Sequence, residues 1–298
     1  MNYPDYPFES HFADVGGCRM HYVDEGPRDG PVVVMVHGNP TWSFYYRRLI
    51  LALRGTHRVI VPDHVGMGMS DRPAEGAYEF TLGRRVEDLE KLLAGLELQG
   101  KITLVVHDWG GMIGMAWATR HPEMVGRIVV LNTGAFTLPK SKTMPWQLTL
   151  ARTPGVGAVA VRGFNAFSRG AVKDCVMRPM AADVARAYIA PYDSWAGRLA
   201  VHRFIQDIPL KPGDRAYEIV ANVEKNIRQF ADVPMLICWG MKDFVFDVHF
   251  LNRWVELFPK ATVHRFDEAG HYVLEDEYAR IVPLVKGFLG VGAMGGGQ

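Results

Sequence analysis

The sequence lacks the features that mark nucleic-acid-binding and membrane-spanning proteins. Its 33 basic and 32 acidic residues leave a net charge of +1 at pH 7. There is no basic run with interleaved aromatic residues, which argues against nucleic acid as a partner. No segment reaches the roughly 18 uninterrupted apolar residues of a bilayer span, and residues 1–12 lack the pattern of a secretory signal. We therefore expect a cytoplasmic protein with no membrane span.

Cysteine is also scarce. The three cysteines, Cys18, Cys175 and Cys238, are odd in number and show no CxxC spacing. The sequence therefore predicts neither a disulfide framework nor a zinc site. Cys238 lies inside an apolar run and is expected to be a core residue. Because no other ligand cluster stands out, we expect no metal and no other cofactor.

Short apolar runs separated by helical patterns predict an α/β fold with a mostly parallel sheet. Continuous runs of this kind are typical of strands buried on both faces of such a sheet. In residues 81–98 the apolar side chains recur at spacings of three and four, which predicts a helix packed on the sheet. The predicted strands are residues 32–37, 58–62, 102–107, 127–132, 235–239 and 262–266.

The alternation of strands and helices stops after the 127–132 strand and resumes only at Met235. A structureless loop of that length is improbable in a compact domain, so we interpret this segment as an inserted helical cap. Its aromatic side chains either pack inside the cap or line a substrate pocket. The expected division is a core of 1–135 and 229–290, a cap of 136–228 and a flexible tail of 291–298. The pocket candidates are Phe136, Phe164, Phe167, Tyr188 and Trp195.

Residues 105–111, VVHDWGG, run from a predicted strand straight into a helical pattern. Asp108 therefore lies at a sharp strand-to-helix turn, where hydrolases with a nucleophile elbow carry serine. Gly110 and Gly111 have no β-carbon, which permits close backbone approach at such a turn. Val106 occupies the first small position of the G-x-S-x-G pattern, a departure from that pattern. A second interpretation is that Asp108 caps the helix, a role that aspartate favours.

Three other positions complete the arrangement that a nucleophile at Asp108 requires. Asn39 follows the first long strand, where its backbone N–H and that of Trp109 are placed to form an oxyanion hole. Asp243 follows the 235–239 strand, and His271 follows the 262–266 strand. The order nucleophile, acid, histidine is that of the α/β-hydrolases. Asp247 is an alternative acid, but Asp243 lies nearer to its strand.

Five segments resemble the haloalkane dehalogenase family of α/β-hydrolases, and especially the subgroup that includes the β-lactone decarboxylases of olefin biosynthesis. The segments are HGNPTWSFYYRRLI, DHVGMGMSDRP, VVHDWGGMIGMAW, LICWGMKDFVFD and GHYVLED. The resemblance runs from about Tyr6 to about Leu289 and implies an α/β-hydrolase fold with a helical cap after the sixth strand. The roles it implies are nucleophile for Asp108, base for His271, acid for Asp243, and leaving-anion binding for Asn39 and Trp109.

One departure concerns the acid. Some dehalogenases carry it after the strand that here ends at Asn132, where this chain has no carboxylate. Asp243 must then orient the histidine.

An ionised carboxylate is a nucleophile at neutral pH and can displace a leaving group from a saturated carbon. The product would be an alkyl ester of Asp108, which His271 would hydrolyse by activating water. The indole N–H of Trp109 and the side-chain amide of Asn39 can hold a halide or a carboxylate. The leading hypothesis is therefore a hydrolytic haloalkane dehalogenase that acts on a small apolar substrate and releases halide and alcohol.

Two other chemistries stay open at this point. A β-lactone decarboxylase would make long-chain cis-olefins with the same aspartate nucleophile. An epoxide hydrolase would need lid tyrosines, for which Tyr188 and Tyr192 are available. A binding protein would have no need for the complete set of nucleophile, acid and histidine. Self-association through an exposed edge strand, or assembly with olefin-pathway enzymes, is compatible with the sequence.

Overall fold

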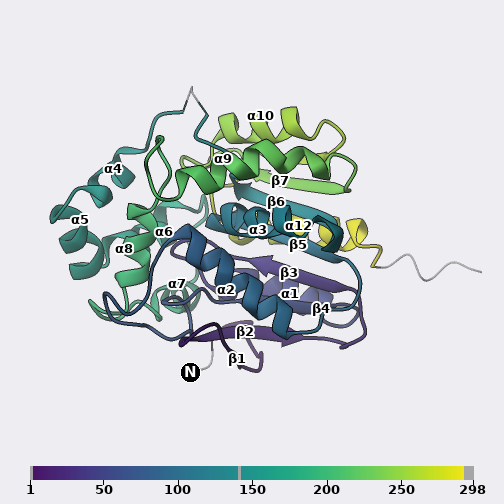
Figure 1. The fold of residues 1–298 in the computed structure, drawn as a ribbon, viewed down its shortest axis with the longest axis horizontal. Coiled ribbons are helices and arrows are strands. Elements are labelled where there is room, and N and C mark those ends of the chain that lie inside the picture. Colours follow the sequence, from purple (N-terminus) through teal and green to yellow (C-terminus); the bar gives the residue numbers. More distant parts are fainter. Residues whose placement is uncertain (1–2, 140–141, 292–298) are drawn as a thin grey trace, which may run out of the picture.

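The computed structural model describes residues 3–139 and 142–291 and contains one eight-stranded sheet (Figure 1). The strand order is β1-β2-β4-β3-β5-β6-β7-β8. β2 pairs antiparallel with β1 and β4, and every other pair is parallel, so the predicted mostly parallel sheet is confirmed. The strands are β1 (His11–Asp14), β2 (Arg19–Glu25), β3 (Val32–Val36), β4 (Arg58–Pro62), β5 (Ile102–Asp108), β6 (Val125–Thr133), β7 (Met235–Gly240) and β8 (Thr262–Phe266).

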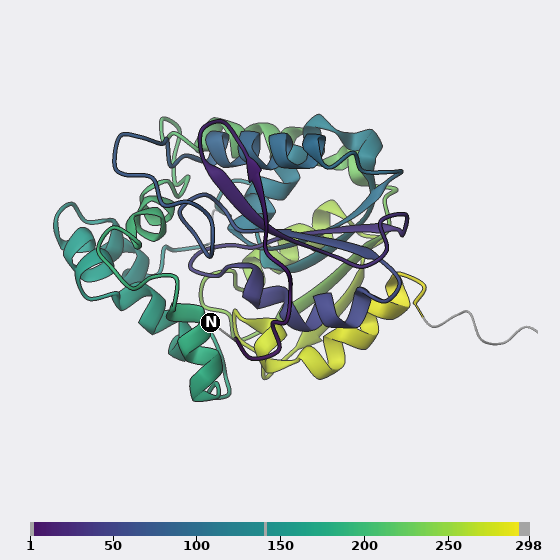
Figure 2. The same ribbon diagram turned by 90° about the horizontal axis from the view of Figure 1, so that it is seen from below.

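Helices cover both faces of the sheet (Figures 1 and 2). Successive side chains of β3 point to opposite faces, so Val34 packs in one apolar core and Met35 in the other. The first core is closed by α2 (Leu82–Gly95), α3 (Trp109–Arg120), α9 (Tyr217–Asn226) and α10 (Val248–Leu257). The second is closed by α1 (Arg47–Leu53), α11 (Val273–Asp276) and α12 (Tyr278–Phe288). Short 3-10 turns are η1 (Ser43–Tyr46), η2 (Pro122–Met124) and η4 (Ile227–Phe230).

The helix predicted within residues 81–98 is α2. Thr81 caps it, because the Thr81 side chain accepts a hydrogen bond from the backbone N–H of Arg84. Leu82, Val86 and Leu89 form part of its buried face. The spacing of apolar residues in the sequence thus places the correct face of α2 against the sheet.

Between β6 and β7 the chain forms helices that gather at one end of the sheet (Figure 1). The last of the helices in the expected cap range, α9, packs instead against α3 over the sheet. The expected domain limits stay a prediction, and residues 292–298 of the expected tail lie outside the described residues. We call the helices at the end of the sheet the cap. They are α4 (Trp146–Arg152), α5 (Val156–Ala158), the π-helical turn η3 (Val159–Gly163), α6 (Ala166–Asp174), α7 (Ala182–Ile189) and α8 (Leu199–Gln206).

Among the residues that the structure describes, no helix is both long and apolar enough to cross a lipid bilayer.

Candidate active site

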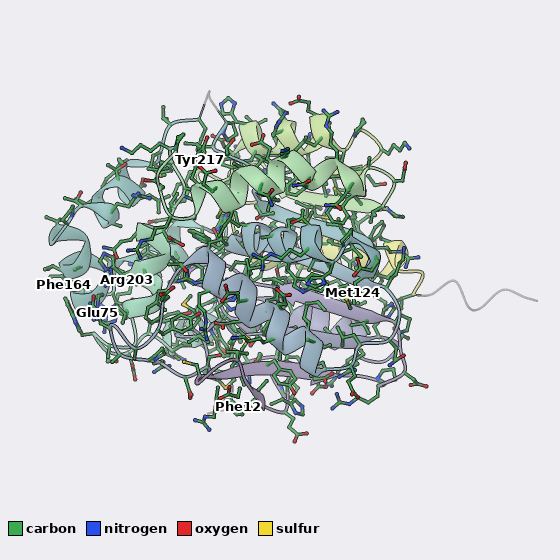
Figure 3. All side chains as sticks on the ribbon, viewed as in Figure 1. Phe12, Glu75, Met124, Phe164, Arg203 and Tyr217 are labelled. Atoms are coloured by element: carbon green, nitrogen blue, oxygen red, sulfur yellow. The ribbon has the colours of Figure 1, made fainter. Side chains whose placement is uncertain are left out.

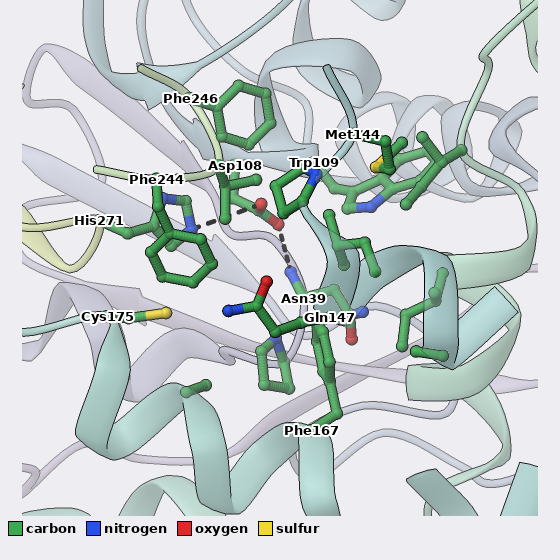
Figure 4. Close-up of a pocket in the computed structure, with 18 of the residues that line it drawn as sticks. Asn39, Asp108, Trp109, Met144, Gln147, Phe167, Cys175, Phe244, Phe246 and His271 are labelled. Atoms are coloured by element: carbon green, nitrogen blue, oxygen red, sulfur yellow. Dashed lines mark hydrogen bonds and ion pairs between the residues drawn. The ribbon is translucent and has the colours of Figure 1, made fainter. Parts of the chain in front are cut away.

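Asp108 is the last residue of β5 and lies directly before α3. Its backbone has φ 51° and ψ −127°, a conformation that residues other than glycine seldom adopt. The Asp108 side chain makes no capping hydrogen bond to α3. Instead its Oδ1 accepts the backbone N–H of Asn39 at 2.6 Å, from the loop after β3 (Figure 4). The turn therefore projects the carboxylate away from its own helix and toward the neighbouring loop.

Glycines make this approach possible. A β-carbon on Gly38 would overlap the Asp108 carboxylate, and one on Gly110 would overlap the carbonyl oxygen of Val36. Each of these contacts would be far inside van der Waals distance. The loop after β3 and the start of α3 can meet around Asp108 only because these two positions lack side chains.

His271 joins the carboxylates of Asp108 and Asp243. Its Nδ1 lies 2.8 Å from Asp243 Oδ2, and its Nε2 lies 3.5 Å from Asp108 Oδ2. All three side chains are buried. The structure thus brings together the nucleophile, histidine and acid that the sequence predicts, each at the carboxyl end of a parallel strand.

The Asp243 carboxylate is fixed by more than the histidine. Its Oδ1 accepts the backbone N–H groups of Val245 and Phe246 at 2.7 and 3.0 Å. Its Oδ2 accepts a hydrogen bond from the Asn132 side-chain amide at 3.0 Å. Asn132 also binds both the N–H and the carbonyl of Gly240 through its amide. The sequence did not predict this function for Asn132, which it indicates only as the last residue of the 127–132 strand.

The alternative acid, Asp247, makes different contacts. Its carboxylate caps α10 through the backbone N–H of His249 at 3.0 Å. It also pairs with the Lys142 ammonium at 2.9 Å. Asp243, and not Asp247, therefore lies against His271.

Burial and charge set the protonation states of the site. Burial disfavours the imidazolium of His271, but the carboxylates of Asp243 and Asp108 outweigh it and raise the pKa of His271 to about 10. Burial opposes ionisation of Asp108, but the hydrogen bond and charge of His271 hold the pKa of Asp108 below its ordinary value. Burial lowers the pKa of His107 to about 3, so this histidine is neutral. Its Nε2 lies 2.9 Å from the carbonyl oxygen of His271 and supports that loop.

Asn39 and Trp109 both contact the same cap helix, α8. The Asn39 amide donates a hydrogen bond to the carbonyl of Val201 at 3.2 Å, which uses one of its two N–H groups. The Trp109 indole packs edge-on against Phe204, with the ring centroids 5.2 Å apart. Both residues line the pocket beside Asp108 (Figure 4).

A pocket of about 300 Å³ lies over Asp108, between the sheet and the cap. Two of the aromatic candidates, Phe136 and Phe167, line it. Most of the rest of the wall is apolar and was not among the candidates, because the local sequence does not show which aliphatic, methionine and aromatic side chains face the pocket. These wall residues include Leu138, Met144, Trp146, Leu148, Leu150, Val161, Cys175, Phe244 and Phe246.

Three of the predicted pocket residues lie elsewhere. Phe164 and Trp195 are 71% and 49% exposed on the outside of the cap. Tyr188 is buried against the core, where its hydroxyl donates to Glu275 at 2.6 Å. Tyr192 is also buried away from the pocket, and its hydroxyl donates to the carbonyl of Thr41. The two tyrosines that epoxide hydrolysis would need therefore do not face Asp108.

The fold and this site define an enzyme of the α/β hydrolase class, and the chain belongs to that family. Residues 31–278 match the family described as "alpha/beta hydrolase fold". A structural comparison agrees: a haloalkane dehalogenase from Bradyrhizobium elkani superimposes with a TM-score of 0.85, over 97% of this chain and all of the other, at 24% identity. At this identity, the likeness to the dehalogenase structure supports the fold alone.

Relatives of higher sequence identity are β-lactone decarboxylases and haloalkane dehalogenases, the family that the sequence motifs resemble. The chain is 53% identical to a cis-3-alkyl-4-alkyloxetan-2-one decarboxylase of Shewanella oneidensis, over 95% of this chain and 89% of that protein. It is 49% identical to the protein of the same name from Xanthomonas campestris pv. campestris, over 97% and 98%. A haloalkane dehalogenase of Mycolicibacterium paratuberculosis is 32% identical, over 92% and 90%.

Proposed function

We propose that this enzyme decarboxylates cis-3,4-dialkyl β-lactones, which are oxetan-2-ones, to cis-alkenes and carbon dioxide. The observation that carries the proposal is the identity of 53% and 49% with two decarboxylases over nearly the whole chain. The dehalogenase relative is less similar, at 32%. This similarity supports the alternative raised by the sequence over the leading dehalogenase hypothesis.

In the first step Asp108 Oδ2 attacks C4, the saturated ring carbon bonded to the ring oxygen, from the side opposite that oxygen. A bond forms between the carboxylate and this carbon, and the carbon–oxygen bond of the ring breaks. The electron pair goes to the ring oxygen, so the lactone becomes an alkyl ester of Asp108 with a free carboxylate on the adjacent carbon. The indole N–H of Trp109 and the unused N–H of the Asn39 amide would bind that carboxylate.

In the second step the bond between the adjacent carbon and its carboxylate breaks, and carbon dioxide leaves. The electron pair forms the carbon–carbon double bond and expels the Asp108 carboxylate. Attack from the far side leaves the two breaking bonds on opposite faces without rotation, so the alkyl groups stay on one side and the alkene is cis. No water or proton is consumed.

His271 therefore has a different task from that in hydrolysis. The carboxylates beside it raise the pKa of His271 to about 10, so the free enzyme carries an imidazolium at neutral pH. This imidazolium would stabilise the negative charge that returns to Asp108 in the second step. Asp243, only 2.8 Å away, holds the ring in place.

Haloalkane dehalogenation is a second candidate, favoured by the two N–H donors of Asn39 and Trp109 beside Asp108. Halide would leave in the first step, and His271 as neutral imidazole would activate water against the ester. Halide binding, self-association, pathway partners and the cytoplasmic location stay predictions.

Turnover in ¹⁸O-labelled water distinguishes decarboxylation from hydrolysis of an Asp108 ester. A long-chain cis-β-lactone should give cis-alkene by gas chromatography, and the peptide that contains Asp108 should stay unlabelled by mass spectrometry. Hydrolysis of an ester would instead place ¹⁸O in the Asp108 carboxylate, because water attacks the carbonyl carbon of that ester. Halide release from 1-bromobutane without alkene from the lactone would reject the proposal. The Asp108→Asn variant should lose both activities when it is freshly purified.

A further inference from the structure

The outer end of the cap presents an unusual number of apolar side chains to solvent. We name this region the cap tip: α4, α5, η3, Phe164 and Trp195. Six of the ten large apolar side chains that are exposed in the described part of the chain belong to it, with exposures of 45–71%. Figure 3 shows Phe164 at the outer edge of the molecule. The six are Trp146, Leu150, Val156, Val159, Phe164 and Trp195.

These side chains form neighbouring patches. Trp146 and Leu150 are four residues apart on α4, and Val156 and Val159 are three apart, so each pair shares one helix face. α4 packs against α5. A β-carbon on Gly163 would lie 3.9 Å from both the Trp195 ring and the Val159 side chain, which places these two beside each other.

The pocket opens at the cap tip. Trp146 and Leu150 line the pocket above Asp108 and are also 71% and 45% exposed. An apolar ligand that entered between these two side chains would pass from an apolar outer surface to a largely apolar wall.

Basic side chains outnumber acidic ones in the segment that carries most of this surface, but Lys142 pairs with Asp247, Arg178 pairs with Glu277, and the exposed Asp193 lies near Trp195. Residues 142–181 carry six basic side chains and only one acidic one, Asp174. Arg162 lies over the Trp195 ring at 4.4 Å, and it shares the single carboxylate of Glu75 with Arg203. The other five basic side chains are Lys142, Arg152, Arg169, Lys173 and Arg178.

Two of these cations are free to meet an external anion. Arg169 and Lys173 are four residues apart on α6, both are exposed, and neither has an ion pair among the described residues. A second copy of the chain docked tip to tip would bring like charges together, which disfavours self-association through this face.

We propose that the cap tip docks on an anionic lipid bilayer, with its apolar side chains inserted at the surface and the pocket opening toward the lipid. Amphipathic surfaces that combine exposed aromatic residues with cations bind membranes in this way. The proposal goes beyond the decarboxylase function and requires only that the ligand be lipid-soluble.

Flotation with vesicles tests the proposal without turnover. The enzyme and its Asp108→Asn variant should both float with vesicles of phosphatidylglycerol and phosphatidylethanolamine. Binding should be weaker to phosphatidylcholine alone and should fall as salt is raised. Because the Asp108→Asn protein is used, failure of the decarboxylase proposal leaves this result unaffected.

Matched variants locate the surface. Val159→Gln with Phe164→Gln should weaken vesicle binding about tenfold or more, because two exposed side chains that do not line the pocket lose their apolar character. Val248→Gln with Phe12→Gln changes the same residue types at exposed positions outside the cap and should have no effect. Arg169→Gln and Lys173→Gln should each cost roughly fivefold on anionic vesicles.

Two results would overturn the proposal. One is equal vesicle binding by the cap-tip and control pairs, or no vesicle binding at all. The other is concentration-dependent association in sedimentation velocity that the Val159→Gln/Phe164→Gln pair abolishes, which would assign the face to a second copy of the chain. Circular dichroism melting confirms that each variant is folded.

Discussion

Asn132 donates a hydrogen bond to the same oxygen of Asp243 that faces His271. The Asn132 Nδ2 lies 3.0 Å from Asp243 Oδ2, and His271 Nδ1 lies 2.8 Å from it. The amide thus orients the acid while the acid orients the histidine. Asn132 has φ 27°, a conformation that asparagine tolerates better than most residues. Asn132, in β6, thus supports a carboxylate that lies after β7.

Asn132→Ala should therefore impair both stability and rate. The variant loses its bond to Asp243 and both bonds to Gly240, and it leaves buried polar groups unpaired. We expect a loss of about 1–3 kcal/mol in the free energy of unfolding, measured by urea denaturation. Asn132→Asp tests the positioning role separately: a second carboxylate beside Asp243 should move the acid limb of the pH–rate profile to higher pH. An unchanged profile would contradict that role.

His271→Ala should separate the two chemistries. With a haloalkane the variant should accumulate an alkyl adduct on Asp108, seen by intact-mass measurement, because no base activates water. With a cis-β-lactone any adduct should be transient, since the ester resolves to alkene by losing carbon dioxide without water. Alkene formation should slow by roughly 10²-fold as charge stabilisation is lost. A lactone-derived adduct that never gives alkene would show that the ester needs hydrolysis.

The pH dependence of stability follows from the raised pKa of His271. Folding raises this pKa from 6.5 to about 10, so proton binding favours the native state. The contribution is fully present below about pH 6.5 and is lost as the pH rises through about 10. The difference in melting temperature between the wild type and His271→Gln should thus be larger at pH 6 than at pH 10. A difference that grows with pH would contradict the assignment. The lactone kcat/KM should also fall as the pH approaches 10.

Gly38→Ala should damage the site selectively. Its β-carbon would collide with the Asp108 carboxylate, and the loop must move away to relieve the overlap. We expect near-complete loss of activity with a stability cost on the order of 1–3 kcal/mol. Gly95→Ala is the matched control, because nothing lies within 4 Å of its β-carbon at the end of α2. That control should be fully active and slightly more stable. Equal activity of the two variants would show that the close approach to Asp108 is not required.

Short-range patterns in the sequence were sufficient for the six parallel strands and for the residues at their ends, but not for the antiparallel strands β1 and β2. Asp108 and Asp243 follow strongly apolar runs, and His271 follows the 262–266 strand. The carboxyl edge of a parallel sheet brings such positions together. The face of α2 likewise follows from apolar spacing alone.

The cap could not be predicted to the same depth. Aromatic residues there have three fates in the structure: Phe167 lines the pocket, Tyr188 is buried against Glu275, and Phe164 is exposed. These fates depend on how short helices pack on one another and on the core, which the local sequence does not encode. The support given by Asn132 to Asp243 joins residues 111 positions apart and is visible only in three dimensions.

Helix α8 contacts both Asn39 and Trp109, so a movement of this helix would affect both residues. Val201 holds the amide of Asn39, and Phe204 holds the indole of Trp109. An outward shift of this one helix would loosen both donors together while widening the route to solvent. Weaker binding of the substrate carboxylate and release of the alkene would then both follow from one movement of α8.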